Sequence, residues 1–198
     1  MKFKTFRALA RNLIAGVAIF SIASLALAEN LPRVKFATSA GDFVVELYPD
    51  RAPKTVDNFL QYVKDKHYDG TIFHRVISNF MVQGGGFDAS YAQKPTRAPV
   101  VHEGRQALEK GLRNTNGMLA MARTNDPQSA SAQFFINVKD NAFLDPNAQS
   151  YGYTVFGKVV SGMDVVDKIK VTPTGPGGPF GSDVPKTPIS INSATLVK

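Results

Sequence analysis

The 198-residue sequence contains no cysteine. Without cysteine the chain cannot form a disulfide scaffold, a zinc–thiolate site or a thiol nucleophile. Its three histidines, His67, His74 and His102, lack the H-x-x-x-H and E-x-x-H spacings that place two metal ligands on one helix face. We therefore expect no metal site, and we expect the fold to be held together by core packing alone.

Motifs for bond-breaking chemistry are also missing. The sequence has no G-x-S-x-G elbow of a serine hydrolase. Its glycine-rich stretch "QGGGF" lacks the Lys-Ser/Thr of a phosphate loop and opens no helix, so these glycines are expected to allow close backbone packing. Hydrolase, kinase and oxidoreductase functions are disfavoured, and no cofactor is expected.

The first 28 residues predict an export signal. "MKFKTFRALARN" carries four basic side chains and no acid, and the mostly apolar run "LIAGVAIFSIASLALA" follows it. A basic start, a short apolar run and small residues before a cleavage point are typical of a secretory signal peptide. An uncleaved membrane anchor is the alternative, but a spanning helix needs about 20 apolar residues. We expect cleavage after Ala28, location in the periplasm and no stable membrane association of the mature chain.

The charge of the chain falls when this segment is removed. The full sequence has 23 basic and 16 acidic residues and a net charge of +7, and all four charges of residues 1–28 are basic. Residues 29–198 therefore carry a net charge of +3, with signs that alternate along the sequence. Since no basic run is interleaved with aromatic residues, we expect no nucleic-acid partner.

Short strand-like segments dominate the rest of the chain. They are residues 33–39, 43–48, 71–77, 80–84, 117–123, 133–138, 153–160 and 189–197. Helical periodicity occurs in 52–70, where Pro53 suits the first turn and Gly70 is the stop signal, and in 162–170. Residues 86–116 have little periodicity, and 172–188 read as a Pro/Gly-rich loop. Many short strands with two helices predict a mainly β fold, a closed antiparallel barrel rather than a βαβ sheet.

The stretch "FHRVISNFMVQGGGF" (73–87) places a charged residue in an apolar hairpin. Arg75 and Gln83 lie on neighbouring strands joined by a tight turn. Because alternate residues of a strand share a face, we expect Arg75 on the same face as Phe73 and Ile77. Charged side chains are rarely fully buried without a partner, so Arg75 either reaches solvent or belongs to a site.

Four sequence blocks resemble those of the cyclophilin family of peptidyl-prolyl cis-trans isomerases. They are "FHRVISNFMVQGGGF", "GMLAMART", "SASAQFFINV" and "YTVFGKVV", in that order, and the resemblance covers roughly all of 29–198. With its N-terminal segment, the sequence is most similar to the periplasmic cyclophilins of Gram-negative bacteria. The resemblance implies an eight-stranded antiparallel β-barrel capped by two α-helices, with an active groove on the outer surface of the barrel.

The resemblance also assigns the site residues. Arg75 within "FHRVI" corresponds to the family's catalytic arginine, and Gln83 is expected to orient Arg75 or the moving carbonyl. The residues expected to bind the peptide are Phe80, Met81, Ala122, Arg123, Thr124, Gln133, Phe135, Phe143, Leu144 and Tyr153.

This sequence departs from the family pattern at three places in the site. The usual Ala-Asn-Ala is Ala122-Arg123-Thr124, the loop tryptophan is Phe143, and the groove histidine is Tyr153. The 122–124 stretch is expected to offer backbone groups to the peptide. Its side-chain contacts are the part of the site that these departures affect most.

The function implied is acceleration of X–Pro isomerisation during the folding of exported proteins. Rotation about this bond breaks no covalent bond, so it requires no nucleophile, metal or cofactor. An arginine N–H directed at the prolyl nitrogen would bind the twisted transition state more tightly than the planar ground state. The expected partners are proline-containing unfolded or partly folded polypeptides, bound by a monomer. The alternative is a proline-peptide binding module, or a chaperone with little turnover, because either could use the same apolar groove.

Overall fold

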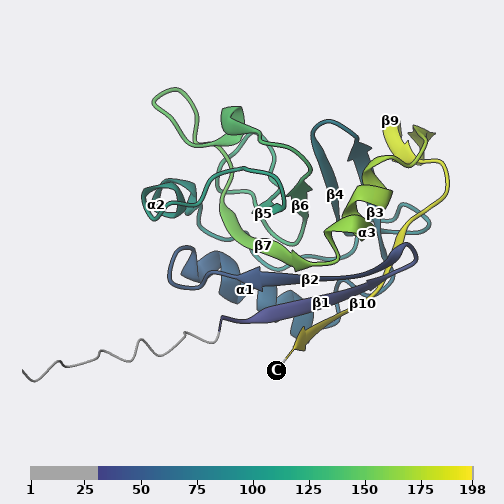
Figure 1. Ribbon diagram of the computed structural model, residues 1–198, viewed down its shortest axis with the longest axis horizontal. Helices are drawn as coiled ribbons and strands as arrows, with labels where there is room; N and C mark the ends of the chain where they lie inside the picture. The colour runs from purple at the N-terminus through teal and green to yellow at the C-terminus, as the bar shows by residue number, and fades with distance from the viewer. Residues whose placement is uncertain (1–30, 198) are drawn as a thin grey trace, which may run out of the picture.

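A closed barrel of eight antiparallel strands forms the centre of the fold, as the sequence predicts. The computed structural model describes residues 31–197, so the predicted signal peptide, 1–28, lies outside the described residues. The barrel strands are β1 (Arg33–Thr38), β2 (Gly41–Leu47), β3 (Thr71–Ile77), β4 (Met81–Asp88), β5 (Met118–Met121), β6 (Phe134–Asn137), β7 (Val155–Ser161) and β10 (Ser190–Val197). Around the barrel they follow the order β1-β10-β3-β4-β6-β5-β7-β2, and β2 pairs with β1 to close it (Figure 1).

Apolar side chains fill the interior of the barrel. On β1, Val34 and Phe36 are fully buried, whereas Arg33 and Lys35, which alternate with them, are exposed. The Phe36 ring stacks on Phe43 of β2 with 4.9 Å between ring centroids, and it lies 5.3 Å from Phe134 of β6. Because full burial of one such side chain contributes about 1.5–3 kcal/mol, this aromatic cluster is a main source of stability for a chain without disulfides.

Two of the three α-helices in residues 31–197 close the barrel core. α1 (Pro53–Lys64) and α3 (Met163–Lys170) bury their apolar faces in the interior cluster. They are the two helices that the sequence predicts. The third helix, α2 (Gly104–Glu109), belongs to the segment without periodicity, and its Ala107 joins a second apolar cluster on the outer surface. Six residues are too few to show a helical period. No helix in the described part of the chain has the length and apolar character needed to cross a membrane.

α1 is shorter than the sequence predicts. It ends at Lys64 and does not continue toward Gly70. The Asp65 N–H donates to the Gln61 carbonyl oxygen at 3.0 Å, and Lys66 then adopts a left-handed φ of 55°. A left-handed residue ends a helix even when it is not glycine. The end was mispredicted because Gly70 is the first conventional stop signal in the sequence.

A β-bulge in β3 corrects the predicted orientation of Phe73. Phe73 pairs with Gly84 of β4 and Arg75 pairs with Gln83, the adjacent residue, so His74 is an extra residue in β3. Phe73 consequently belongs to the barrel core, while Arg75 lies on the outer surface. The prediction that the two share a face was wrong, because a bulge shifts the alternation of a strand by one residue.

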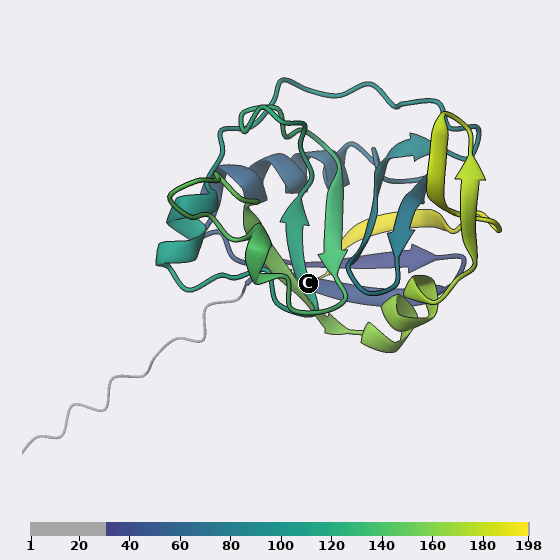
Figure 2. The ribbon, with the colours of Figure 1, turned by 90° about the horizontal axis from the view of Figure 1, so that it is seen from above.

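The Pro/Gly-rich segment 172–188 contains a hairpin where the sequence predicts only a loop. β8 (Thr174–Gly177) and β9 (Phe180–Pro185) pair with each other outside the barrel. β9 lies against β3, and Figure 2 shows the hairpin standing beside β3 and β4. Proline and glycine are depleted in strands, so this segment carries no strand pattern in the sequence.

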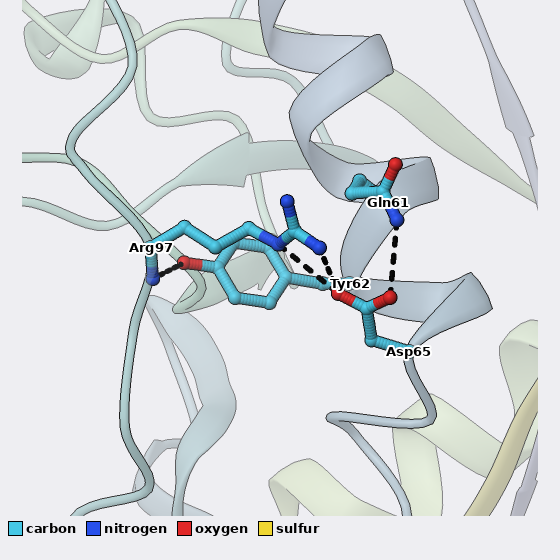
Figure 3. A network of polar contacts seen from close by, with 4 residues as sticks. All are labelled: Gln61, Tyr62, Asp65 and Arg97. Carbon is cyan, nitrogen blue, oxygen red and sulfur yellow. Dashed lines mark hydrogen bonds and ion pairs between the residues drawn. The ribbon is translucent and has the colours of Figure 1, made fainter.

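The connection between β4 and α2, residues 89–103, is held against α1. The Arg97 backbone N–H donates to the Tyr62 hydroxyl oxygen at 2.7 Å, and the Arg97 guanidinium pairs with the Asp65 carboxylate (Figure 3). These contacts fix an irregular segment on the helix that closes the barrel. Gln93 of the same connection reaches the groove described below.

Candidate active site

A groove crosses the outer surface of β3, β4 and β6 and has a volume of about 440 Å³. Every site residue expected from the sequence lines it, with the exception of Phe143. The lining also includes residues that the sequence did not single out, namely His74, Phe87, Gln93, Ser129, Ser131 and Phe180. The fold therefore gathers side chains from distant parts of the sequence into one cavity.

One part of the groove is an apolar pocket. Met81 of β4, Phe135 of β6 and Leu144 are 2%, 4% and 7% exposed, and the half-buried Phe80 and Tyr153 pack against them. The rings of Phe135 and Tyr153 meet edge to face, with centroids 5.4 Å apart. Rigid apolar walls of this kind suit a small apolar ring such as that of proline.

Buried side-chain amides hold one wall of this pocket in place. The short 3₁₀ helix η1 (Ala142–Leu144) carries Leu144 and follows Asn141, whose side chain is buried. The Asn141 Nδ2 donates to the Phe80 carbonyl oxygen and to Asn137 Oδ1, each at 2.8 Å. This arrangement ties the Leu144 wall of the pocket to the start of β4 and to β6.

Arg75 stands beside the apolar pocket on the bulged strand. Its side chain is 44% exposed, and its Nε lies 3.9 Å from Oδ2 of Asp183 on β9. Gln83, directly opposite in the strand register, donates its Nε2 to Gln133 Oε1 at 3.0 Å. Among the residues that the structure describes, no side-chain hydrogen bond joins Gln83 to Arg75. The terminal guanidinium nitrogens of Arg75 also make no hydrogen bond within the described residues, so they are available to bind a ligand.

Gly86 allows Gln133 to lie in the groove. A Cβ atom at position 86 would be 2.5 Å from Gln133 Cγ, a separation that atoms cannot adopt. Gln133 in turn accepts the hydrogen bond from Gln83. The expectation that the glycines of "QGGGF" permit close packing is confirmed, and at Gly86 the close neighbour is a groove side chain.

The stretch 122–124 is more occupied than expected. The Ala122 N–H donates to the Gln133 carbonyl oxygen at 3.0 Å, and the Thr124 N–H donates to Ser129 Oγ at 2.9 Å. These two amides are already used inside the protein, so a peptide would have to bind the remaining backbone groups.

The departure from the family at Arg123 has a clear structural effect. Its guanidinium carbon lies 4.6 Å from the centre of the Tyr153 ring, and its Nη2 donates to the Gly152 carbonyl oxygen at 2.8 Å. Arg123 therefore supports one wall of the apolar pocket. A cation over an aromatic face adds roughly 0.5–1 kcal/mol at such partly exposed positions.

Phe143 lies at the rim and not in the groove. It is 68% exposed and stacks on Phe80 with ring centroids 5.6 Å apart. Its contact with the site is therefore indirect, through Phe80.

Three of the missed residues, His74, Phe87 and Phe180, form an aromatic cluster that lines the groove. Phe180 of β9 stacks on His74 with ring centroids 5.3 Å apart, and it meets Phe87 edge to face at 5.1 Å. His74 and Phe87 occur within "FHRVISNFMVQGGGF", so their position was a usable signal. Phe180 is the single aromatic residue of a Pro/Gly-rich segment, which is a weaker signal.

His74 is uncharged at neutral pH. Burial lowers its pKa from 6.5 to about 4, and the positive charge of Arg75 acts in the same direction. The ring is 3% exposed and its Nδ1 has no hydrogen-bond partner in the described structure. His74 acts here as an aromatic side chain in a packed cluster.

A closed barrel with an apolar pocket beside an exposed arginine on its outer surface agrees with the class of protein that the sequence resembles. The sequence model of that class, "Cyclophilin type peptidyl-prolyl cis-trans isomerase/CLD", matches residues 33–196. The chain belongs to the cyclophilin family and is a peptidyl-prolyl cis-trans isomerase.

Individual relatives agree with this assignment. A peptidyl-prolyl cis-trans isomerase of Streptomyces antibioticus is 56% identical over 83% of this chain and 98% of its own length. Peptidyl-prolyl cis-trans isomerase B of Escherichia coli K12 is 52% identical over 82% of this chain and 98% of its own. Peptidyl-prolyl cis-trans isomerase A of Dickeya dadantii is 47% identical over 95% of this chain and 98% of its own.

A solved structure supports the fold independently. A cyclophilin-type isomerase of Cryptosporidium parvum, crystallised in the presence of the dipeptide Ala-Pro, has a TM-score of 0.64 at 24% identity, over 84% of this chain and 99% of its own.

Proposed function

We propose that Arg75 is the catalytic residue and that the adjacent apolar pocket holds the proline ring of the substrate. The observation that carries this proposal is the juxtaposition of one exposed guanidinium with a rigid pocket formed by Met81, Phe135 and Leu144. The Cryptosporidium parvum structure in the presence of Ala-Pro supports a proline-containing ligand as the occupant.

The chemistry follows from the electronic structure of the X–Pro bond. In the planar ground state the nitrogen lone pair is delocalised, and rotation has a barrier of about 18–20 kcal/mol. In the twisted state the lone pair returns to nitrogen, which becomes a better acceptor. An N–H of Arg75 directed at that nitrogen stabilises the twisted state selectively, and arginine suits this role because it remains charged and presents fixed donors.

The remaining groove residues orient the peptide. Phe80 and Tyr153 complete the apolar pocket, while Gln83 and Gln133, which hydrogen-bond to each other, present polar groups beside Arg75. The free backbone groups of 122–124 bind the extended chain. A complete groove within one chain supports action as a monomer.

We further propose that the enzyme acts on exported polypeptides in the periplasm, after cleavage between Ala28 and Glu29. The basic and apolar character of residues 1–28 supports this. Mass spectrometry of the protein from a periplasmic extract should show a chain that begins at Glu29. Full-length protein in the membrane fraction would contradict the proposal.

A coupled proline-isomerisation assay on residues 29–198 tests the role of Arg75. Arg75→Ala should lower kcat/KM about 100-fold or more, because it removes a donor to the transition state. Arg75→Lys should also be poor, since an ammonium does not reproduce the planar fork. Arg33→Ala is the matched control, because Arg33 is similarly exposed on β1 and does not line the groove. Wild-type activity in Arg75→Ala would favour the alternative, a proline-peptide binding module.

A further inference from the structure

The β8–β9 hairpin holds Asp183 close to Arg75. On one side of Asp183, Phe180 is held among the rings of His74, Phe87 and Tyr91. On the other side, Val184 is 2% exposed. Between these anchors stands Asp183, so the position of its backbone is determined by packing that does not involve Arg75.

The backbone of Asp183 has an unusual conformation. Its φ is 65°, one of only three positive φ values at non-glycine residues in the described part of the chain. Aspartate tolerates this left-handed region better than most residues do, but glycine is its usual occupant. The Asp183 carboxylate held at this position has one charged contact among the described residues.

That contact is Arg75. Asp183 Oδ2 lies 3.9 Å from Arg75 Nε, and no other ion pair of Arg75 occurs among the residues that the structure describes. The side chains of Arg75 and Asp183 are 44% and 35% exposed, and exposed pairs contribute little to folding stability. A contribution to folding stability therefore does not explain this pair. Orientation of the Arg75 guanidinium is a role that fits its position beside the groove.

We propose that Asp183 is a positioning residue that orients Arg75 for catalysis. The carboxylate attracts the Nε side of the guanidinium, which turns the terminal N–H groups toward the groove. Gln83, which the sequence suggested for this task, donates its side-chain N–H to Gln133 instead. This inference rests on the proposed catalytic role of Arg75 and adds the residue that holds it.

Kinetics of Asp183→Asn test the inference. Asparagine keeps the shape of the side chain and tolerates a left-handed backbone, but it has no charge. We expect kcat to fall about two- to fivefold, as the loss of an exposed ion pair predicts, with KM and the melting temperature unchanged. Asp183→Gly, which relieves the backbone and removes the carboxylate, should give the same loss. Asp42→Asn is the matched control, because it removes one charge from the exposed Lys35–Asp42 pair, away from the groove.

Two further readouts separate orientation from a merely structural effect. The difference in kcat between wild type and Asp183→Asn should shrink at about 1 M salt, where the Debye length is about 3 Å. In the Arg75→Ala background, Asp183→Asn should cause no additional loss, because residues that act through one another are not additive.

The outcomes also separate this inference from the proposed function. An impaired Arg75→Ala together with a fully active Asp183→Asn would overturn the inference alone. An equal loss from Asp183→Asn with and without Arg75 would overturn it as well. Wild-type turnover in Arg75→Ala would overturn both the role of Arg75 and the role of Asp183.

Discussion

Phe134 and Phe135 are neighbours on β6, yet they belong to different regions of the molecule. Phe134 points into the barrel, where its ring lies 5.3 Å from Phe36 and 5.5 Å from Tyr68. Phe135 points outward and forms a wall of the groove beside Tyr153. Both are almost fully buried, at 0% and 4% exposure. Burial alone therefore does not distinguish a residue of the barrel core from one that lines the groove.

The difference lies in what covers each ring. The interior ring is covered on all sides by other side chains of the core, while the outer ring borders a cavity open to a ligand. Substitutions inside should change the free energy of unfolding, and those in the groove should change substrate binding.

The largest expected effect is on stability inside the barrel. Phe134→Ala should lower the free energy of unfolding by about 3–5 kcal/mol, because it removes a fully buried ring and leaves a cavity. Urea unfolding measures this value. Phe143→Ala is the matched control, since that ring is 68% exposed and its loss should change stability by no more than about 0.5 kcal/mol. Similar losses in the two variants would contradict the division between interior and surface.

A smaller effect is expected from acid at the aromatic wall of the groove. The unfolded chain protonates His74 below about pH 6.5, but in the folded protein the pKa of His74 is about 4 because the ring is buried. Between these values the unfolded state binds more protons, so stability decreases as the pH falls. The His74 share of the loss is at most about 3 kcal/mol by pH 4. Burial also lowers the pKa values of His67 and His102, which act in the same direction.

Unfolding curves of wild type and His74→Gln at pH 7 and pH 4.5 isolate this share. The stability of the variant should depend less on pH than that of the wild type. His102→Gln, at a half-buried histidine outside the groove wall, serves for comparison. Equal pH dependence in wild type and His74→Gln would contradict the burial argument.

The third effect is on substrate binding in the groove. Phe135→Ala should raise KM about tenfold, equivalent to about 1.4 kcal/mol, because substrate and transition state both lose the same pocket wall. Initial rates over a range of peptide concentrations give KM and kcat separately. An unchanged KM in a folded Phe135→Ala protein would mean that the proline ring binds elsewhere.

The sequence predicts the features that depend on local patterns, and it misses those that depend on contacts between distant segments. The barrel strands, the two longer helices and Arg75's place in a hairpin follow from alternation, periodicity and a long sequence block. These signals are local and repeat along the chain. The face of Phe73 was mispredicted because one extra residue, His74, reverses the alternation without any visible sign.

The remaining misses depend on contacts between distant segments. The β8–β9 hairpin lacks a strand pattern, so neither the Phe180 wall nor the Asp183 contact with Arg75 was foreseen. The use of the Ala122 and Thr124 amides inside the protein likewise depends on partners that only the fold brings close. Most of the residues that the resemblance singled out line the groove, but the resemblance gave no account of what holds them there.

NMR exchange spectroscopy on Arg75→Ala, at an enzyme concentration that saturates an X–Pro peptide, tests the central claim most directly. It measures how fast the bound peptide exchanges between its cis and trans forms. One sample then reports both binding and isomerisation on the enzyme. We predict that the peptide still binds, with an affinity within about threefold of the wild-type value, because the pocket of Met81, Phe135 and Leu144 is intact. We also predict that exchange cross-peaks between the two bound isomers disappear. Exchange at the wild-type rate in Arg75→Ala would contradict the assignment of Arg75 as the catalytic residue.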